Sequence, residues 1–170
     1  MIIRQETPED VNEIKNVNDL AFQQEDESVL IHKLRESEAF IPELSLVAVR
    51  ENKVVGHILF TRIHIESETH STLSLALAPM AVHPDFQKQG IGTAMVEQGL
   101  KKAQSLGYKS VVVLGHDQYY PKFGFKKAND FGVKAPFEEV PEEAFMVNEL
   151  EEGSLQNVEG KVRYSEPFME

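Results

Sequence analysis

The sequence contains no cysteine among its 170 residues. Disulfides, thiolate-bound metal ions and a cysteine nucleophile are therefore excluded, and so is acyl transfer through a thioester on the protein. No apolar run approaches the ~20 residues of a membrane helix. The first residues, Met1-Ile2-Ile3-Arg4, lack the basic and apolar regions of a signal peptide. We therefore expect a cytoplasmic protein.

Positive charge is also scarce. The chain has 17 Lys and Arg against 28 Asp and Glu, which gives a formal net charge of −11. Long-range electrostatics then oppose nucleic acids and anionic membranes, and we expect neither as a partner. A phosphate-bearing ligand would have to be held by local basic groups and backbone amides. The length and the 41% hydrophobic content predict a single domain over residues 1–170, with a C-terminal extension from about residue 131.

Two N-terminal helices are predicted. Thr7 at the cap, Pro8 in the first turn and Asp10 at the capping-box position mark the start of the first. Its inward stripe is expected to comprise Val11, Ile14, Val17 and Phe22. The second is expected over 27–37, with Val29, Leu30 and Leu34 inward. The polar run 23–27 between them is predicted to be a solvated connection.

Several apolar, β-branched segments predict a mixed, mostly antiparallel sheet flanked by helices, an α/β (α+β) fold. The strands are expected at residues 2–4, 44–50, 54–65, 73–82 and 110–114, with further extended pieces at 144–147 and 158–164. A helix over 93–106 separates the fourth from the fifth, so these two strands should be parallel. Gly107 is the expected C-cap of that helix.

The stretch 80–95 carries the strongest chemical signal. His83-Pro84 should end the preceding strand near Val82, and the next residues, Gln-Lys-Gln-Gly-Ile-Gly at 87–92, lead into a helix. The first helical amides have no intrahelical acceptor and the helix dipole is positive there, so this arrangement favours an anion such as a phosphate. A dinucleotide fingerprint is rejected because Met95 stands where the third glycine belongs, and no Gly-Lys-Ser/Thr of a nucleotide-triphosphate loop follows.

Gln-x-x-Gly-x-Gly after a strand ending in Ala-Val-His-Pro closely resembles the acyl-CoA pyrophosphate loop of the GNAT superfamily of N-acetyltransferases. A second pattern, Tyr120-x-x-x-Gly124-Phe125, resembles that family's later signature. Both patterns occur in the expected order, and together they make an ordinary strand-to-helix turn with two glycines the weaker interpretation. The chain is similar to a bacterial-type subgroup of small predicted acetyltransferases.

The resemblance implies a GNAT-like sheet in which a splayed parallel strand pair holds acetyl-CoA, an acetyl-donor cosubstrate, without a metal ion. The implied cofactor-binding residues are Met80, Ala81, Val82, Gln87, Lys88, Gln89, Gly90, Ile91, Gly92 and Thr93. Backbone groups of Met80 and Val82 would contact the pantetheine arm, and one of their amides could stabilise the oxyanion. Gln87 replaces the arginine that many relatives carry. Tyr120 matches the general acid that protonates the departing thiolate, although a misregister by one residue would exchange it with Tyr119.

The implied reaction is direct transfer of the acetyl group of acetyl-CoA to a primary amine of a small molecule or peptide through a ternary complex. A non-catalytic acyl-CoA-binding sensor or protein-interaction module is the alternative. The acceptor has no distinctive motif, although the resemblance implies that the region around residues 23–27 lines the acceptor site and could contribute to amine recognition. A monomer or a homodimer is equally compatible with the sequence. His116 and Asp117 are weaker candidates for a general base, and His57 is expected to be a hydrogen-bonded structural residue. No pair of histidines has a clear metal-ligand spacing.

Overall fold

The computed structural model describes all 170 residues and divides into two compact units. The first comprises Met1–Thr61 and Leu77–Lys102, and the second comprises Arg62–Ala76 and Ala103–Glu170. Two long strands and one helix contribute to both. None of the helices combines the length and the apolar character that crossing a membrane requires.

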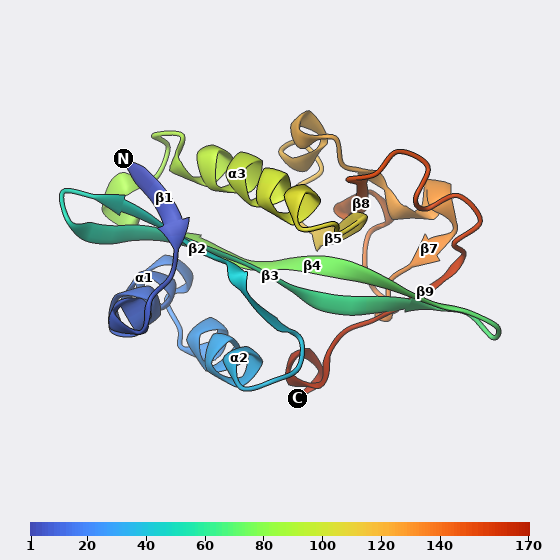
Figure 1. The fold of residues 1–170 in the computed structure, drawn as a ribbon, viewed down its shortest axis with the longest axis horizontal. Helices are drawn as coiled ribbons and strands as arrows, with labels where there is room; N and C mark the ends of the chain where they lie inside the picture. The colour runs from blue at the N-terminus through green and yellow to red at the C-terminus, as the bar shows by residue number, and fades with distance from the viewer. The chain divides into compact units, whose positions relative to one another are not determined.

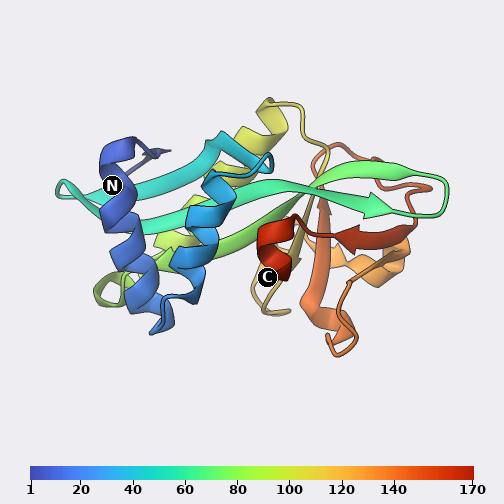
Figure 2. The ribbon, with the colours of Figure 1, turned by 90° about the horizontal axis from the view of Figure 1, so that it is seen from below.

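The first unit is a sheet with helices on both faces (Figure 1). Its strands follow the order β1-β2-β3-β4. The elements are β1 (Ile2–Gln5), α1 (Val11–Phe22), α2 (Asp26–Arg35), β2 (Phe40–Arg50), β3 (Lys53–Glu66, to residue 61), β4 (Ser71–Val82, from residue 77) and α3 (Ile91–Ser105, to residue 102), with short 3-10 turns η1 (Pro8–Asp10) and η2 (Pro84–Phe86). Helices α1 and α2 lie side by side on one face of these strands (Figure 2), and α3 covers the other.

Local sequence explains how this unit begins. Asp10 accepts a hydrogen bond from the Thr7 amide at 2.7 Å, so the predicted capping box is present, and α1 follows the short turn η1. The β2–β3 hairpin turns at Glu51 and Asn52, which both have positive φ (52° and 62°), as a two-residue turn of the primed type requires. The predicted end of β4 also holds, since the strand ends at Val82 as the His-Pro pair indicated, whereas it begins at Ser71, two residues before the predicted start.

The second unit contains the remaining part of the sheet. It includes the last residues of β3, from residue 62, and the first residues of β4, to residue 76. Its strands follow the order β9-β3-β4-β5-β8-β6, and β7 pairs with β9. The elements are β5 (Ser110–Leu114), η3 (Tyr120–Phe123), β6 (Lys126–Lys127), η4 (Ala128–Phe131), β7 (Val133–Lys134), η5 (Glu142–Ala144), β8 (Phe145–Glu149), β9 (Gly160–Arg163) and η6 (Glu166–Met169).

Strands β4 and β5 are parallel, with Leu75 opposite Val111 and Ala76 opposite Val112. The other long pairings are antiparallel, so the mixed, mostly antiparallel sheet predicted from the sequence is confirmed. Gly107 has a φ of 92° and its amide bonds to the carbonyl of Gln104, as expected of a residue that ends a helix. The two predicted extended pieces near the C-terminus are β8 and β9. The single-domain assignment of residues 1–170 stays a prediction.

Two predicted inward positions are wrong. Phe22 and Val29 are exposed, with 37% and 48% of their surface accessible. Phe22 is the last residue of α1, where the chain turns away through Gln23 in a left-handed conformation. Helix α2 is rotated from the predicted orientation because Ser28, Ile31 and Leu34 form its buried face. The sequence predicts the apolar positions 29, 30 and 34 for the inward face. It does not predict the observed set 28, 31 and 34, because Ser28 is polar.

Candidate acyl-CoA site

The predicted anion-binding loop follows directly from the end of β4. The His83 amide donates to the carbonyl of Val55 at 2.8 Å, so the residue that follows β4 is still hydrogen-bonded to β3. The Asp85 amide then donates to His83 Nδ1 at 3.1 Å, so the His83 side chain stabilises the turn η2. The loop therefore starts from a fixed point on the sheet.

Two residues with left-handed backbone conformations shape the loop itself. Lys88 has a φ of 64° and Gly90 a φ of 83°. A Cβ placed on Gly90 would meet nothing within 4 Å, so the glycine is needed for its backbone conformation and not for lack of space. Gln87 Nε2 donates to the Val82 carbonyl at 3.0 Å, which folds the loop back onto β4. Residues 87–90 are all exposed, and a ligand can reach their backbone.

Helix α3 begins two residues earlier than the sequence predicts, at Ile91. Its first intrahelical bond runs from the Ala94 amide to the Gly90 carbonyl at 3.0 Å. The amides of residues 91–93 precede this bond and lie at the positive end of the helix dipole, where an anion is favoured. Buried Ile91 and Met95 anchor this first turn on β3 at Gly56, whose hypothetical Cβ would lie 3.0 Å from the Met95 side chain. Gly56 therefore allows the close approach of the helix.

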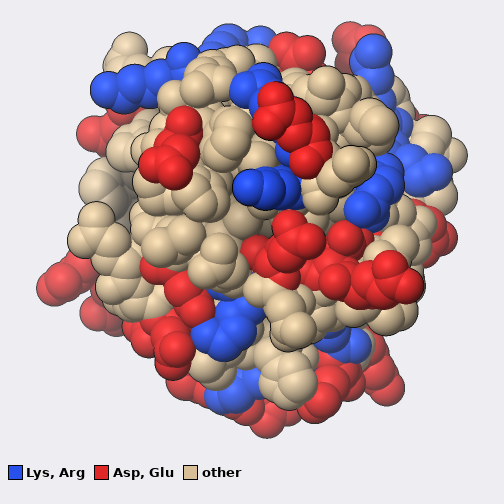
Figure 3. Space-filling view, turned by 90° about the vertical axis from the view of Figure 1, so that its left-hand side faces the viewer, with Lys and Arg blue, Asp and Glu red and all other residues tan.

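A basic residue that the sequence analysis missed also reaches this loop. Arg50, at the end of β2, donates from Nη1 to Gln89 Oε1 at 2.6 Å, and its guanidinium carbon lies 5.8 Å from the centre of the Phe86 ring. Together with exposed Lys88 it supplies positive charge that Gln87 does not. On the face of the protein shown in Figure 3, basic side chains are scattered among acidic ones. Nothing in the sequence around Arg50 indicates this contact, because it depends on the pairing of distant segments.

The second signature forms a short aromatic turn in the second unit. Residues 120–123 make the 3-10 turn η3, and the amides of Tyr119 and Tyr120 both donate to the His116 carbonyl. Gly124 ends the turn with a φ of 99°, and Asn148 of β8 donates to the Phe123 carbonyl at 2.9 Å. The second signature therefore folds as a single 3-10 turn. The following strand, β6, starts at Lys126, just after the Gly-Phe pair.

The two tyrosines of this turn differ in their environment. Tyr120 is 8% exposed and its ring packs edge-on against Tyr119 and Phe125, with centroid distances of 5.0 and 5.6 Å. Burial, and secondarily the nearby Tyr119, raises the pKa of Tyr120 to about 12, so its phenol is protonated at neutral pH. The Tyr120 hydroxyl makes no hydrogen bond with another group of the chain. Tyr119 is half-buried, and the Lys122 ammonium lies 4.1 Å from the centre of its ring.

The histidine candidates separate clearly. His116 and Asp117 are exposed residues of the loop before η3. His57 is fully buried and its Nε2 lies 2.9 Å from Ser45 Oγ, which confirms a hydrogen-bonded structural position. The Ser45 hydroxyl also bonds to the carboxylate of Glu6, which can only accept. Ser45 therefore donates to Glu6 and accepts from His57, so the hydrogen bonds assign the proton to Nε2 and leave Nδ1 a buried acceptor without a partner.

The buried group around Glu6 was not found from the sequence. Burial raises the pKa of Glu6, but the His57 imidazole 3.7 Å away and hydrogen bonds from Arg35 and Ser45 outweigh it and lower the pKa to about 2. Burial also lowers the pKa of His57, and nearby Glu6 offsets this only in part, so the imidazole is neutral. These four residues come from four segments, and no spacing in the sequence brings them together. The group is recognised by its buried carboxylate beside a cation, a feature that only the three-dimensional structure reveals.

The predicted cofactor-binding residues form one continuous feature of the first unit. Met80, Ala81 and Val82 end β4, residues 87–90 form the loop, and Ile91, Gly92 and Thr93 open α3. Ile91 is buried beneath the loop, so it supports the site through its backbone and its packing. Tyr120 belongs to the second unit. The roles of all these residues remain predictions.

Comparison with known proteins identifies the family. The sequence profile of the acetyltransferase (GNAT) family matches residues 11–125. The chain is 42% identical over 135 residues to the uncharacterized N-acetyltransferase YjhQ of Escherichia coli, covering 79% of this chain and 74% of that protein. It is 33% identical over 169 residues to the uncharacterized N-acetyltransferase YhbS of the same species, covering 99% of this chain and 98% of that one.

Two solved structures extend the comparison. The crystal structure of E. coli YhbS in complex with CoA superposes with a TM-score of 0.91 at 30% identity and covers 99% of this chain and 92% of that one. A GNAT family acetyltransferase from Brucella melitensis in complex with acetyl-CoA gives a TM-score of 0.80 at 28% identity, with 98% and 97% covered. The chain therefore belongs to the acetyltransferase (GNAT) family and is an N-acetyltransferase, as its two sequence signatures predict.

Proposed function

We propose that the protein transfers the acetyl group of acetyl-CoA directly to a primary amine of a small molecule or a peptide, through a ternary complex. The donor is supported by the relatives solved with CoA and with acetyl-CoA. A direct transfer is supported by the absence of cysteine, because no thiol on the protein can carry the acetyl group.

The donor is held mainly by backbone groups. Amides of Gly90, Gly92 and Thr93 at the start of α3 bind the pyrophosphate, and Gln87, Lys88 and Gln89 border it. Arg50 adds positive charge from β2. The end of β4, Met80–Val82, offers its amides and carbonyls to the pantetheine arm, and one of its N–H groups stabilises the oxyanion.

In the reaction, the neutral amine nitrogen attacks the thioester carbonyl carbon and forms the new C–N bond. The C–S bond then breaks, and the departing thiolate takes a proton from the Tyr120 hydroxyl. The amine loses one proton to solvent or to a base, and Tyr120 regains its own from solvent. Tyr120 is suited to this step because its raised pKa keeps the proton on the phenol at neutral pH.

One observation carries the catalytic assignment. The Tyr120 ring is buried among aromatic side chains, yet its hydroxyl has no hydrogen-bond partner within the chain. The hydroxyl is not one of the buried atoms that lack a partner, so it lies at an accessible end of the ring and is available for a bound ligand. A purely structural aromatic residue at this position could equally be phenylalanine.

A calorimetric titration with acetyl-CoA tests the donor site. We expect wild-type protein to bind, Gly92→Leu to lose binding, and Gln98→Leu to bind as wild type does, because Gln98 is an exposed position further along α3. Unchanged binding by folded Gly92→Leu would contradict the proposed pyrophosphate site. No binding by folded wild-type protein would contradict the proposed function.

The alternative is a non-catalytic acyl-CoA-binding module. It predicts acetyl-CoA binding without acetyl transfer to any amine class. The release of CoA thiol in the presence of small amines, polyamines and peptides separates the two readings, and a protein without cysteine gives no background in that assay. The unpartnered Tyr120 hydroxyl favours the enzyme, because a binding module has no evident need for it.

A further inference from the structure

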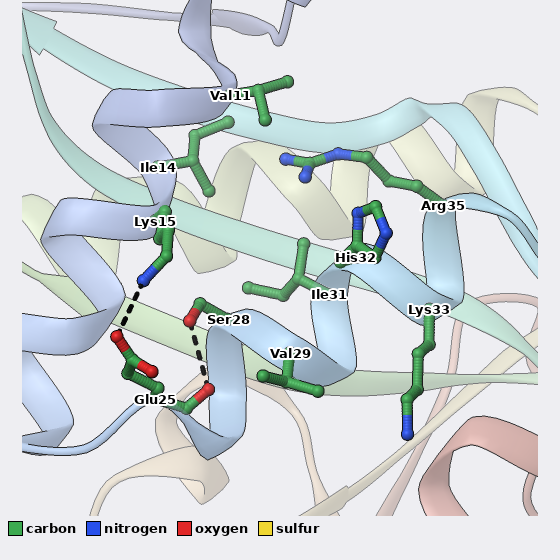
Figure 4. A pocket seen from close by; sticks show the side chains of 10 residues that line it. All are labelled: Val11, Ile14, Lys15, Glu25, Ser28, Val29, Ile31, His32, Lys33 and Arg35. Carbon is green, nitrogen blue, oxygen red and sulfur yellow. Dashed lines mark hydrogen bonds and ion pairs between the residues drawn. The ribbon is translucent and has the colours of Figure 1, made fainter.

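A groove between α1 and α2 is not used by the proposed reaction. It has a volume of about 280 Å³ and belongs entirely to the first unit. Its apolar lining comes from Val11 and Ile14 of α1 and from Val29 and Ile31 of α2 (Figure 4). Ligand pockets are commonly of this kind, an apolar surface with a few polar groups that fix orientation.

The polar lining of this groove combines cations with carboxylates. Its cations are Lys15, Lys33 and Arg35, and its carboxylate is Glu25. Lys15 is paired with Glu25 and with Asp19, and Arg35 is paired with Glu6, so the groove carries no large excess of either charge. Recognition of a ligand must therefore come from the geometry of a particular group, and that group is Arg35.

The Arg35 guanidinium is fixed by the Glu6 carboxylate. Its Nε and Nη2 donate to the two carboxylate oxygens of Glu6, at 2.9 and 3.2 Å. Glu6 in turn accepts from Ser45, which is bonded to His57, and both of these residues are fully buried. Such a buried polar shell fixes the guanidinium in one orientation before any ligand arrives, which lowers the entropy cost of binding.

One edge of the guanidinium remains for a ligand. Glu6 occupies the edge formed by Nε and Nη2, whereas Nη1 makes no hydrogen bond with another group of the chain. The Arg35 side chain reaches from α2 towards Val11 and Ile14 of α1, along the groove (Figure 4). The edge formed by Nη1 and Nη2 matches a carboxylate, which can accept two parallel hydrogen bonds from it.

We propose that this groove binds a small monocarboxylic acid with an apolar body. The carboxylate bonds to the Nη1–Nη2 edge of Arg35, and the apolar body lies against Val11, Ile14 and Ile31, with Val29 at the exposed rim. This site is separate from the residues assigned to acetyl-CoA, and the inference does not depend on the proposed transfer reaction. Acetyl-CoA and the carboxylic acid should therefore bind independently.

The test is calorimetric titration with octanoate, octanol and octylamine, three probes that share a chain length. We expect one octanoate per protein, weaker binding of octanol and the weakest of octylamine. The Val29→Glu variant should bind octanoate about tenfold more weakly, because a carboxylate at the rim repels the ligand. The control Leu20→Glu adds the same charge at an exposed position of α1 outside the groove and should bind as wild type does.

Arg35→Gln should also lose octanoate binding, but it leaves Glu6 without its cation and can destabilise the fold. The exposed Val29 avoids this difficulty, so Val29→Glu keeps the test decisive. Absence of octanoate binding to folded wild-type protein, octylamine binding as tightly as octanoate, or equal binding by Val29→Glu would each overturn the proposal. Binding of acetyl-CoA in the same samples reports on the other site separately.

Discussion

The loop at residues 83–93 and the turn at residues 115–125 carry the two signatures of the family, but different forces shape them. Residues 87–90 of the loop are exposed and its form comes from backbone conformation, with positive φ at Lys88 and Gly90. The turn is organised by ring packing around buried Tyr120, and Gly115 leaves room for that ring. Substitutions in the loop should therefore change ligand binding more than stability. Substitutions in the turn should change stability unless they keep the ring.

The largest effect is expected for Tyr120→Phe. The ring and its packing remain, so the free energy of unfolding and acetyl-CoA affinity should change little, while kcat falls by about 100-fold or more through loss of the general acid. Steady-state kinetics with calorimetry measures both. Tyr119→Phe is the matched control and should keep most of the activity. Equal loss of turnover and affinity in Tyr120→Phe would contradict the assigned role.

Gly115→Ala should show how tightly the turn is packed. The added Cβ would lie 2.5 Å from a carbon of the Tyr120 ring, so the ring must move, and we expect a loss of about 2 kcal/mol in the free energy of unfolding. Urea denaturation measures it. In a Tyr120→Ala background the same substitution should cost much less, since the ring is gone. A similar cost in both backgrounds would show that Gly115 matters for another reason.

Gly90→Ala probes the loop in the same way but should cost less. No atom lies within 4 Å of the new Cβ, so only the φ of 83° opposes the alanine, and about 1 kcal/mol should be lost. Gly90→Asn should recover part of that stability, because asparagine tolerates this conformation. Acetyl-CoA binding should weaken in both variants. A loss as large as that of Gly115→Ala would break the distinction between loop and turn.

A smaller effect is expected for Arg50→Gln. This exposed contact with Gln89 should contribute modestly, so acetyl-CoA affinity should fall by about threefold, and the difference should shrink at high salt. Lys53→Gln removes the same charge from the exposed residue that pairs with Arg50 across the β2–β3 hairpin, and it serves as the control. Equal losses in the two variants would indicate a general charge effect in place of a local contact.

The pH dependence should show no effect of Tyr120 over the accessible range. Its pKa is raised to about 12, so the phenol stays protonated and kcat should not fall between pH 7 and about pH 10 through its ionisation. The profile of kcat against pH measures this in buffers of constant ionic strength. A descending limb below pH 10 that disappears in Tyr120→Phe would contradict the raised pKa.

The features that could be predicted from the sequence are those that depend on residues close together along the chain. Pro84 stopped β4, Gly90 and Gly92 marked the loop, and the Val111–Val113 run marked the buried strand β5, because each depends on neighbours along the chain. The contact of Arg50 with the loop, and that of Glu6 with Arg35, join segments 39 and 29 residues apart. No local pattern encodes such contacts. The rotation of α2 was missed for a related reason, since a buried serine hid its inward face.

The buried group of Glu6, Arg35, Ser45 and His57 also limits how this sequence can change over evolution. Replacing one member leaves a buried charge or hydrogen-bonding group without its partner, which costs several kcal/mol, whereas apolar side chains at all four positions together can be nearly neutral. The four positions should therefore be inherited as a set. In an alignment of the family we expect relatives to keep all four residues or to have replaced them jointly, with single departures rare.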